Sequence, residues 1–237
     1  MVRSVIAAIL TLVLALGIVA DARADIMTPP GLQPGQQFRI VFVTAATTSA
    51  TSRSLSTYDA VVSGDAAAGG LATYNGSPVI WEAIGSTPTV NAITRLPADG
   101  VPLFLPDGSL VAPTGAALWN TLSTPLIHPI IEHANGVMDS GHFAWTGTDP
   151  TGVGQFLNEL GRGRVGTGGD TFADSSWVDT GFSSSGGVAR PLYGFSSVLT
   201  VPVPEPGTLA LALVGIGGLV GTHLDRRRRK AASRPTE

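Results

Sequence analysis

Residues 38–44 read Phe38-Arg-Ile-Val-Phe-Val-Thr44, and this stretch decides the class of fold that we expect. It is rich in β-branched and aromatic side chains, which favour a pleated strand over a helix. A short apolar run of this kind indicates a strand that is buried in the core. Elsewhere the chain is dense in Gly, Pro, Ser and Thr, which favours short strands and long loops over a helical bundle.

A helix is expected after this strand, beyond a Ser/Thr-rich connection. Ser56-Thr-Tyr-Asp59 has the pattern of a capping box, in which Asp59 reaches back to the cap residue. One helical face would carry the apolar side chains of Leu55, Tyr58, Val61 and Val62. We expect this helix to continue to about Ala68 and to end at Gly69-Gly70.

Further short elements are predicted between turn signals. Strands are predicted at residues 79–83, in two pieces at 103–112 around a Pro-Asp-Gly turn, at 143–148, at 176–179 and at 192–200. A short helix is predicted at residues 116–122, and a glycine-rich loop from Gly161 to Asp174. We therefore expect one α+β domain, with short strands and long loops, over residues 25–201.

The first 24 residues have the pattern of a secretory signal peptide. Arg3 supplies a basic start, residues 5–20 are apolar, and Ala22-Arg-Ala24 is a small-x-small cleavage site. The mature chain is then expected to begin at Asp25. The alternative is an uncleaved N-terminal transmembrane helix, since the apolar run approaches the length of a membrane span.

Composition restricts the partners of this exported domain. The chain has no cysteine, so the domain must be held by its core without disulfides. Residues 25–206 are enough for one self-sufficient domain. Between Asp25 and Pro206, 14 acidic residues, six arginines and no lysine give a formal charge of −8. A domain this acidic is repelled by phosphate backbones, so we expect no nucleic-acid partner.

One candidate site is the group of polar side chains His128, Glu132, His133 and His142. Imidazoles and carboxylates are common ligands of zinc and similar metals. However, His128 and His133 are five residues apart and do not align on a helix face, so a loop with surface histidines is favoured. The chain also lacks a Gly-x-Ser-x-Gly nucleophile elbow. We therefore expect no enzyme activity and no cofactor, and keep a secreted hydrolase that uses these residues as the third hypothesis.

A second candidate site lies in the Gly/Ser-rich stretch 166–180. Asp170, Asp174 and Asp179 are potential oxygen ligands for calcium, and Trp177 lies among them. The spacing is not that of an EF-hand, and Asp is also a common turn former. A loop that binds calcium or another ligand and a plain loop both stay open.

The second half of the chain carries an ordered set of tryptophan and glycine motifs. They are Trp145-Thr-Gly-Thr-Asp149, the Gly-rich stretch, Ser176-Trp177 and Arg190-Pro-Leu-Tyr-Gly-Phe195. This order resembles bacterial secreted domains with a C-type-lectin-like fold, over about residues 38–201. The resemblance implies a central sheet built from a Trp-x-Gly strand, a tryptophan after the long loop and a closing apolar strand. The chain departs from that family because it lacks cysteines and the Glu-Pro-Asn or Gln-Pro-Asp triplet of calcium-dependent sugar binding.

The C-terminal segment contains an uncharged run at residues 208–224. As a helix it would span about 25 Å, at the short end for a hydrocarbon core about 30 Å thick. The basic run Arg226-Arg227-Arg228-Arg229-Lys230 follows, and the positive-inside bias places it in the cytoplasm. We therefore expect a transmembrane helix at 208–224, a cytoplasmic tail at 231–237 and an acidic domain outside.

Three features occur in order at this end: Pro204-Glu205-Pro206, the apolar run and the arginine-rich end. Together they resemble the PEP-CTERM sorting signal of Gram-negative bacteria, over about residues 202–230. The resemblance implies recognition by an exosortase, a membrane peptidase that cuts near Pro-Glu-Pro. It also implies a transient anchor in the inner membrane and delivery to the cell surface or the exopolysaccharide matrix. An ordinary single-pass anchor would leave Pro-Glu-Pro unexplained.

These patterns predict a non-enzymatic, exported surface or matrix protein with one α+β domain. The second hypothesis is a module that binds extracellular polysaccharide through Trp177 and Asp179.

Overall fold

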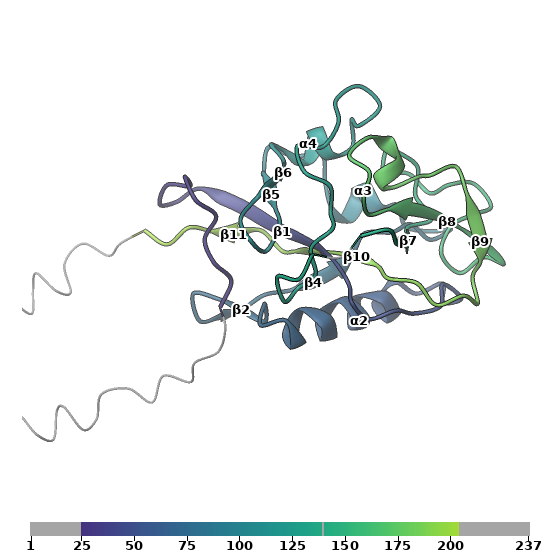
Figure 1. The fold of residues 1–237 in the computed structure, drawn as a ribbon, viewed down its shortest axis with the longest axis horizontal. Helices are drawn as coiled ribbons and strands as arrows, with labels where there is room; N and C mark the ends of the chain where they lie inside the picture. The colour runs from purple at the N-terminus through teal and green to yellow at the C-terminus, as the bar shows by residue number, and fades with distance from the viewer. Residues whose placement is uncertain (1–24, 139, 204–237) are drawn as a thin grey trace, which may run out of the picture.

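The computed structural model of the chain describes residues 25–138 and 140–203 (Figure 1). The predicted signal peptide at 1–24, the Pro-Glu-Pro motif at 204–206 and the predicted transmembrane helix at 208–224 lie outside these residues. Within the two described ranges, no helix combines the length and the apolar character needed to cross a membrane. The described chain folds into mixed sheets with few helices, in agreement with the predicted α+β class.

The main sheet has the strand order β4-β10-β1-β5-β6, and β11 pairs with the start of β1. Its strands are β1 (Gln37–Val43), β4 (Trp81–Ala83), β5 (Leu103–Phe104), β6 (Leu110–Ala112), β10 (Tyr193–Ser196) and β11 (Leu199–Thr200). β1 runs parallel to β5, and the other pairs are antiparallel. The predicted first strand is thus confirmed. The single strand predicted at 192–200 is instead two strands, because β10 and β11 pair with different parts of β1.

Side chains of β1 alternate between two cores, which is why this strand is apolar on both faces. Phe38, Ile40 and Phe42 pack into one cluster of buried side chains, and Val41 and Val43 into the other. Alternation with a period of two residues places successive side chains on opposite faces of a sheet. A strand covered on both faces therefore reads as a nearly continuous apolar run, which in this stretch is interrupted by Arg39.

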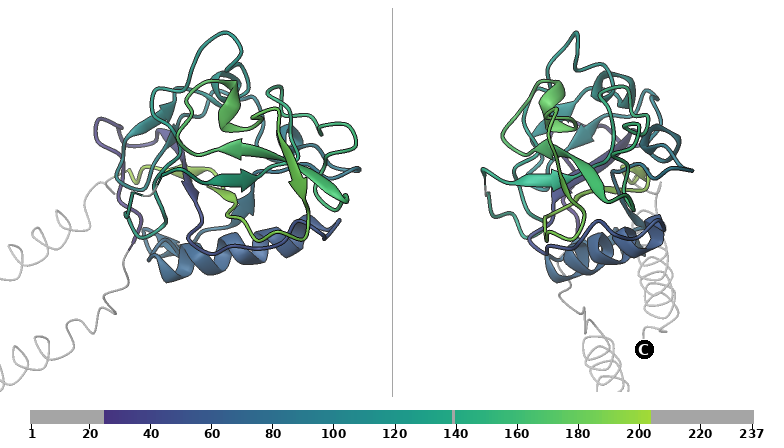
Figure 2. Two further views of the ribbon diagram at one scale, coloured as in Figure 1. Left: turned by 45° about the vertical axis from the view of Figure 1, so that its right-hand side comes forward. Right: turned by 90° about the vertical axis from the view of Figure 1, so that its right-hand side faces the viewer.

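Helix α2 (Leu55–Ala68) covers one face of the main sheet and ends at the residue predicted from the sequence. It buries Tyr58, Val62 and Ala66 in the cluster that contains Phe42. The predicted capping box is wrong, because the cap residue is Ser54 and its side chain makes no capping hydrogen bond. Figure 2 shows α2 lying along one side of the domain, beneath the rest of the fold.

The glycine-rich stretch predicted as a loop contains a strand instead. A second sheet has the order β7-β8-β9, with β7 at Phe143–Trp145, β8 at Arg164–Gly169 and β9 at Ser183–Ser185. Glycine disfavours strands unless another group approaches the backbone closely. Here a Cβ on Gly168 would overlap the carbonyl oxygen of Trp177, so glycine is required for this packing.

The other elements are short. They are the hairpin β2 (Thr73–Tyr74) and β3 (Ser77–Pro78), the helices α3 (Ala92–Arg95) and α4 (Gly115–Leu118), and the 3₁₀ helix η1 (Ser175–Trp177). The helix predicted at 116–122 is therefore one short turn, and the strand predicted at 176–179 is wrong. Asp174 accepts a hydrogen bond from Ser176 N at the start of η1, a capping contact that favours a helical turn there.

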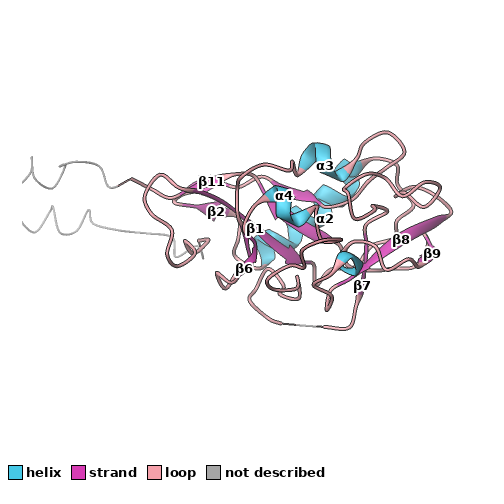
Figure 3. Ribbon diagram, turned by 90° about the horizontal axis from the view of Figure 1, so that it is seen from above, coloured by secondary structure: helices cyan, strands magenta, loops and turns pink. Residues whose placement is uncertain are grey.

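Both ends of the described chain leave the domain on the same side. Gly35 N donates to Val201 O and Val201 N donates to Gln36 O, which places the last packed residue beside the start of β1. Figures 1 and 3 show the first and last described residues at this end of the domain, whereas β8 and β9 lie at the opposite end. The end that carries β7, β8 and β9 therefore lies opposite Val203, the last described residue.

Candidate functional site

The four residues of the predicted histidine site contact different parts of the fold. His128 is exposed, and its Nδ1 donates to Leu110 O on β6. His133 is buried, and its Nδ1 donates to Val43 O at the end of β1. Each of these imidazoles ties a loop to the main sheet.

Glu132 is buried beside His133, with 1% of its surface exposed. Its Oε2 accepts a hydrogen bond from Asp107 N at 3.1 Å, which links the loop before β7 to the turn between β5 and β6. Burial, reinforced by the charge of Asp107, raises the pKa of Glu132 from 4.5 to about 7. The carboxyl group therefore titrates near neutral pH, but it is not among the residues that line the groove beside Asp99.

His142 lies beside Asp170, a pair that joins the two predicted candidate sites. His142 Nδ1 is 3.4 Å from Asp170 Oδ2, and the imidazole is 47% exposed whereas the carboxylate is 1% exposed. The Asp170 carboxylate also accepts from the backbone N–H groups of Gly141 and His142. It thereby holds the Gly141-His142 turn against the end of β8.

Asp174 and Asp179 each support a local turn. Asp174 caps η1, as described above. Asp179 Oδ1 accepts from Gln155 Nε2 at 3.0 Å and from Gly181 N at 2.8 Å, so it joins the loop before β8 to the turn before β9. These contacts are those expected of Asp as a turn former.

Trp177 is fully buried, so in this conformation its ring cannot stack on a ligand at the surface. Its ring packs between Trp119 and Tyr193, with centroid separations of 5.7 Å on both sides. Burial, followed by the charge of Asp170, raises the pKa of Tyr193 well above its ordinary value. This aromatic stack fills the second core cluster.

The predicted site residues do not meet at one centre. In residues 25–138 and 140–203, no three His, Asp or Glu side chains come together in a group suited to hold a metal ion. The only contact between the two candidate sites that we find in this part of the chain is that of His142 with Asp170.

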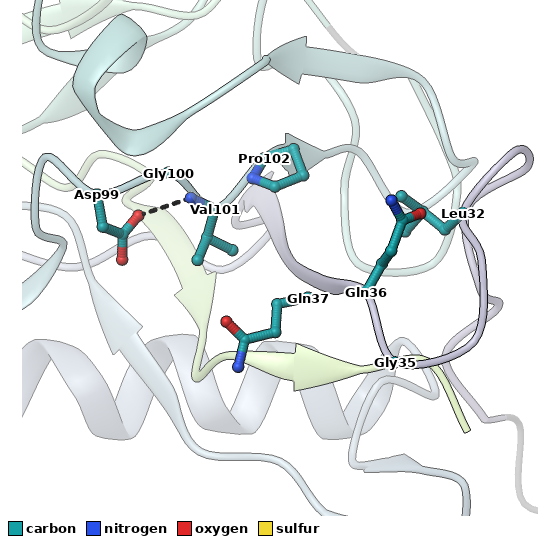
Figure 4. A pocket seen from close by; sticks show the side chains of 8 residues that line it. All are labelled: Leu32, Gly35, Gln36, Gln37, Asp99, Gly100, Val101 and Pro102. Carbon is teal, nitrogen blue, oxygen red and sulfur yellow. Dashed lines mark hydrogen bonds between the residues drawn. The ribbon is translucent and has the colours of Figure 1, made fainter. Parts of the chain in front are cut away.

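A groove of about 650 Å³, which the sequence did not predict, lies near the end where the chain leaves (Figure 4). It is lined by Leu32, Gly35, Gln36, Gln37, Asp99, Gly100, Val101 and Pro102. Two segments that are distant in the chain form it, so no local motif could reveal it. Figure 4 shows the Asp99 carboxylate accepting a hydrogen bond from Val101 N on the groove wall.

Arg39 controls the charge of this groove wall. It donates to both carboxylate oxygens of Asp99, at 3.0 and 2.9 Å. Burial opposes ionisation of Asp99, but the hydrogen bonds and charge of Arg39 outweigh it, so the pKa of Asp99 is lower than usual. The groove thus presents exposed glutamine amides and a neutralised carboxylate, and it contains none of the residues predicted from the sequence.

One predicted functional motif, at the C-terminus, matches a known family model. Residues 202–229 match the model of the PEP-CTERM protein-sorting motif, which includes the predicted Pro204-Glu205-Pro206 and Arg226 to Arg229. The sequence matches no curated protein. The motif implies export, processing by an exosortase and a membrane-anchored intermediate before the cell surface is reached. The chain therefore carries a PEP-CTERM protein-sorting motif, which indicates an exported protein that is sorted by an exosortase.

Proposed function

We propose that the chain is a non-enzymatic surface or matrix protein, whose domain leaves the inner membrane when an exosortase cuts near Pro204-Glu205-Pro206. The main support for this proposal is the position at which the motif begins. Val201 is 7% exposed and pairs through its backbone with Gln36, and the matched motif starts at the next residue. The domain therefore ends where the sorting motif begins.

The short connection would keep the anchored domain close to the membrane. Six residues separate Val201 from Thr208, where the predicted transmembrane helix starts. Such a connection reaches about 25 Å at most when fully extended. Because the chain leaves at one end of the domain, the end that carries β8 and β9 would point outward.

A lectin-like fold is part of this proposal. Support comes from the pairing of the first and last strands of the domain, since β1 lies between β10 and β5 and also pairs with β11. Further support comes from Trp145, which lies on β7 of the second sheet, and from the buried Trp177 after β8.

Binding of an extracellular polysaccharide is the second candidate function. The third, a secreted hydrolase, is not favoured, because His128, Glu132, His133 and His142 contact different parts of the fold. The polysaccharide function is favoured by the outward-facing end of the domain, whose residues are described in the next subsection.

Sorting can be tested with a Glu205→Ala variant and a matched Glu237→Ala control. The proposal predicts that Glu205→Ala retains the protein in the inner-membrane fraction, whereas Glu237→Ala reaches the surface or the medium as the parent does. Cell fractionation with immunoblotting measures this distribution. Equal release of both variants would contradict a role for the Pro-Glu-Pro motif.

A further inference from the structure

Arginines in the domain fall into two groups. Three pair with carboxylates: Arg39 with Asp99, Arg95 with Asp59 and Glu82, and Arg162 with Glu159. The other three are Arg53, Arg164 and Arg190, and no carboxylate of residues 25–138 or 140–203 forms an ion pair with them. Half of the cationic side chains of an acidic domain are therefore not neutralised by a described partner.

These three arginines donate only to uncharged groups or stack on aromatic rings. Arg164 donates to Ser183 Oγ at 3.1 Å and to Ser183 O at 2.6 Å, and Arg53 Nε lies 3.5 Å from Gly161 O. Arg190 donates to Ser184 Oγ at 3.0 Å. Its guanidinium also lies over the rings of Phe143 and Trp145, at 5.6 and 5.2 Å from their centroids. The contacts hold the guanidinium groups in place without cancelling their charge.

The segments that carry these arginines adjoin one another at one end of the domain. Arg164 faces Ser185 across the β8–β9 ladder. Ala50 N donates to Gly186 O and Gly186 N donates to Gly163 O, so the chain before Arg53 and the chain before Arg190 meet beside β8. We call Arg53, Arg164, Arg190 and Ser183–Ser185 the basic end. It is the end with β8 and β9, opposite the departing C-terminus (Figures 1 and 2).

The basic end is accessible and includes an aromatic side chain. Arg53, Arg164 and Ser185 are exposed, and Arg190 is half-buried. Phe182, which directly precedes β9, is 71% exposed. Because Arg164 donates to both the hydroxyl and the carbonyl oxygen of Ser183, its guanidinium lies next to the residue that follows Phe182. Guanidinium and hydroxyl groups are thus presented together, and an exposed aromatic residue directly precedes Ser183 in the chain.

This combination fits a sugar that carries a carboxylate. A guanidinium matches the geometry of a carboxylate with two parallel hydrogen bonds and gives up its hydration more easily than an ammonium group. Serine hydroxyls both donate to and accept from sugar hydroxyls. An exposed phenyl ring offers an apolar surface to the C–H face of a sugar ring.

We propose that the basic end binds acidic polysaccharide outside the cell. The inference rests on the proposed function, because only a surface or matrix protein meets such a polymer. Carboxylates at this end also limit the surface that can bind an anion. Glu159 neutralises Arg162, and Asp179 lies at the turn before Phe182. A duplex nucleic acid suits the basic end less well, because its dense phosphates would also meet the repulsion of a domain with a formal charge of −8.

The experiment uses the full chain in detergent micelles and a surface coated with alginate, a polymer of uronic acids. Binding is measured by biolayer interferometry at 50 mM NaCl with EDTA present, which excludes a contribution from a calcium loop. The double variant Arg53→Gln/Arg164→Gln removes two positive charges. The matched control Gln37→Glu/Asn75→Asp makes the same change in net charge at exposed positions away from β9.

The parent should bind alginate, and the arginine double variant should bind about tenfold or more weakly, because two charge-assisted contacts are lost. The control should stay within about twofold of the parent, and binding should weaken as NaCl is raised, because screening weakens attraction between exposed charges. The variant Arg53→Lys/Arg164→Lys keeps the charge and should bind more tightly than the glutamine pair, which separates charge from folding.

Three results would overturn the proposal. They are equal binding by the parent and the arginine double variant, equal binding of the parent to neutral dextran, and tighter binding to double-stranded DNA than to alginate. Sorting has its own readouts in cell fractionation and in the mass of the mature chain, so failure of this inference is distinguishable from failure of the proposed function.

Discussion

Arg39 and Asp99, which are 60 residues apart in the chain, form an ion pair with two hydrogen bonds beside the groove of about 650 Å³. The Arg39 side chain is 6% exposed and that of Asp99 is 31% exposed. Arg39 lies on β1, and Asp99 also accepts from Val101 N just before β5. The pair therefore links the central strand to the loop that leads into its parallel neighbour.

Asp99→Asn should destabilise the domain by about 2 kcal/mol, because the substitution leaves the buried guanidinium of Arg39 without an opposite charge. We expect a smaller loss of stability than for a fully buried ion pair, since water reaches Asp99. Urea unfolding of the mature chain measures the change, with Asp25→Asn, at an exposed residue, as the control. Equal stability of the two variants would show that the ion pair contributes nothing.

Acid should weaken the same contact. The pKa of Asp99 is lower in the folded state than in the unfolded chain, so the contribution is present above the unfolded pKa and is lost as pH falls through the folded one. The stability difference between parent and Asp99→Asn should therefore shrink on acidification below about pH 4. A difference that stays constant from pH 6 to pH 2 would argue against this linkage.

The contribution of Glu132 to stability should change with pH in the opposite direction. Its pKa is raised from 4.5 to about 7, so its contribution is fully present below pH 4.5 and is lost as pH rises through about 7. Between pH 5 and pH 8 the parent should lose about 2 kcal/mol relative to Glu132→Gln, which does not ionise. Thermal or urea unfolding at several pH values gives this difference directly. Parallel curves for parent and variant would mean that Glu132 has an ordinary pKa.

Gly168→Ala should destabilise the second sheet strongly, because the new Cβ would overlap the Trp177 carbonyl oxygen. We expect a loss of about 3 kcal/mol, as for other overpacked cores. Gly163→Ala is the matched control, because no atom lies within 4 Å of its Cβ position. If the two alanine variants unfolded at the same temperature, β8 would not pack against Trp177 as described.

Removal of calcium should leave stability unchanged. The carboxylates of Asp170 and Asp179 accept hydrogen bonds from protein N–H groups, and Asp174 caps η1, so turn formation accounts for all three residues. Differential scanning fluorimetry with 5 mM CaCl₂ and with EDTA should give melting temperatures within about 1 °C, since a ligand stabilises only the state that binds it. A calcium-dependent rise that Asp179→Asn abolishes would instead establish the calcium loop.

The strongest apolar patterns in the sequence predicted β1 and most of α2, because β1 is a short apolar run and α2 has apolar residues on one helical face. Local patterns failed where a distant neighbour decided the conformation. Gly166 to Gly169 read as a loop, since the Trp177 carbonyl that excludes a side chain at Gly168 lies outside the stretch. Trp177 read as a ligand contact for the same reason, because its partners Trp119 and Tyr193 are remote in sequence.

The candidate sites show the same difference between local patterns and contacts of distant segments. The sorting motif is linear, so its residues could be identified from sequence alone and are matched at 202–229. The groove beside Asp99 and the basic end are assembled from separate segments, so neither had a local signature. Arg53, Arg164 and Arg190 in particular become a group only when the loop before α2 meets β8 and β9.

We propose above all that an exosortase removes the C-terminal segment. Intact-mass measurement of the mature protein tests it most directly, in parent cells and in cells that lack the exosortase. We expect a chain that starts at Asp25 and ends near Pro206 in the parent, and a chain that keeps its full C-terminal segment in the deletion strain. A full-length C-terminus in both strains would contradict the claim.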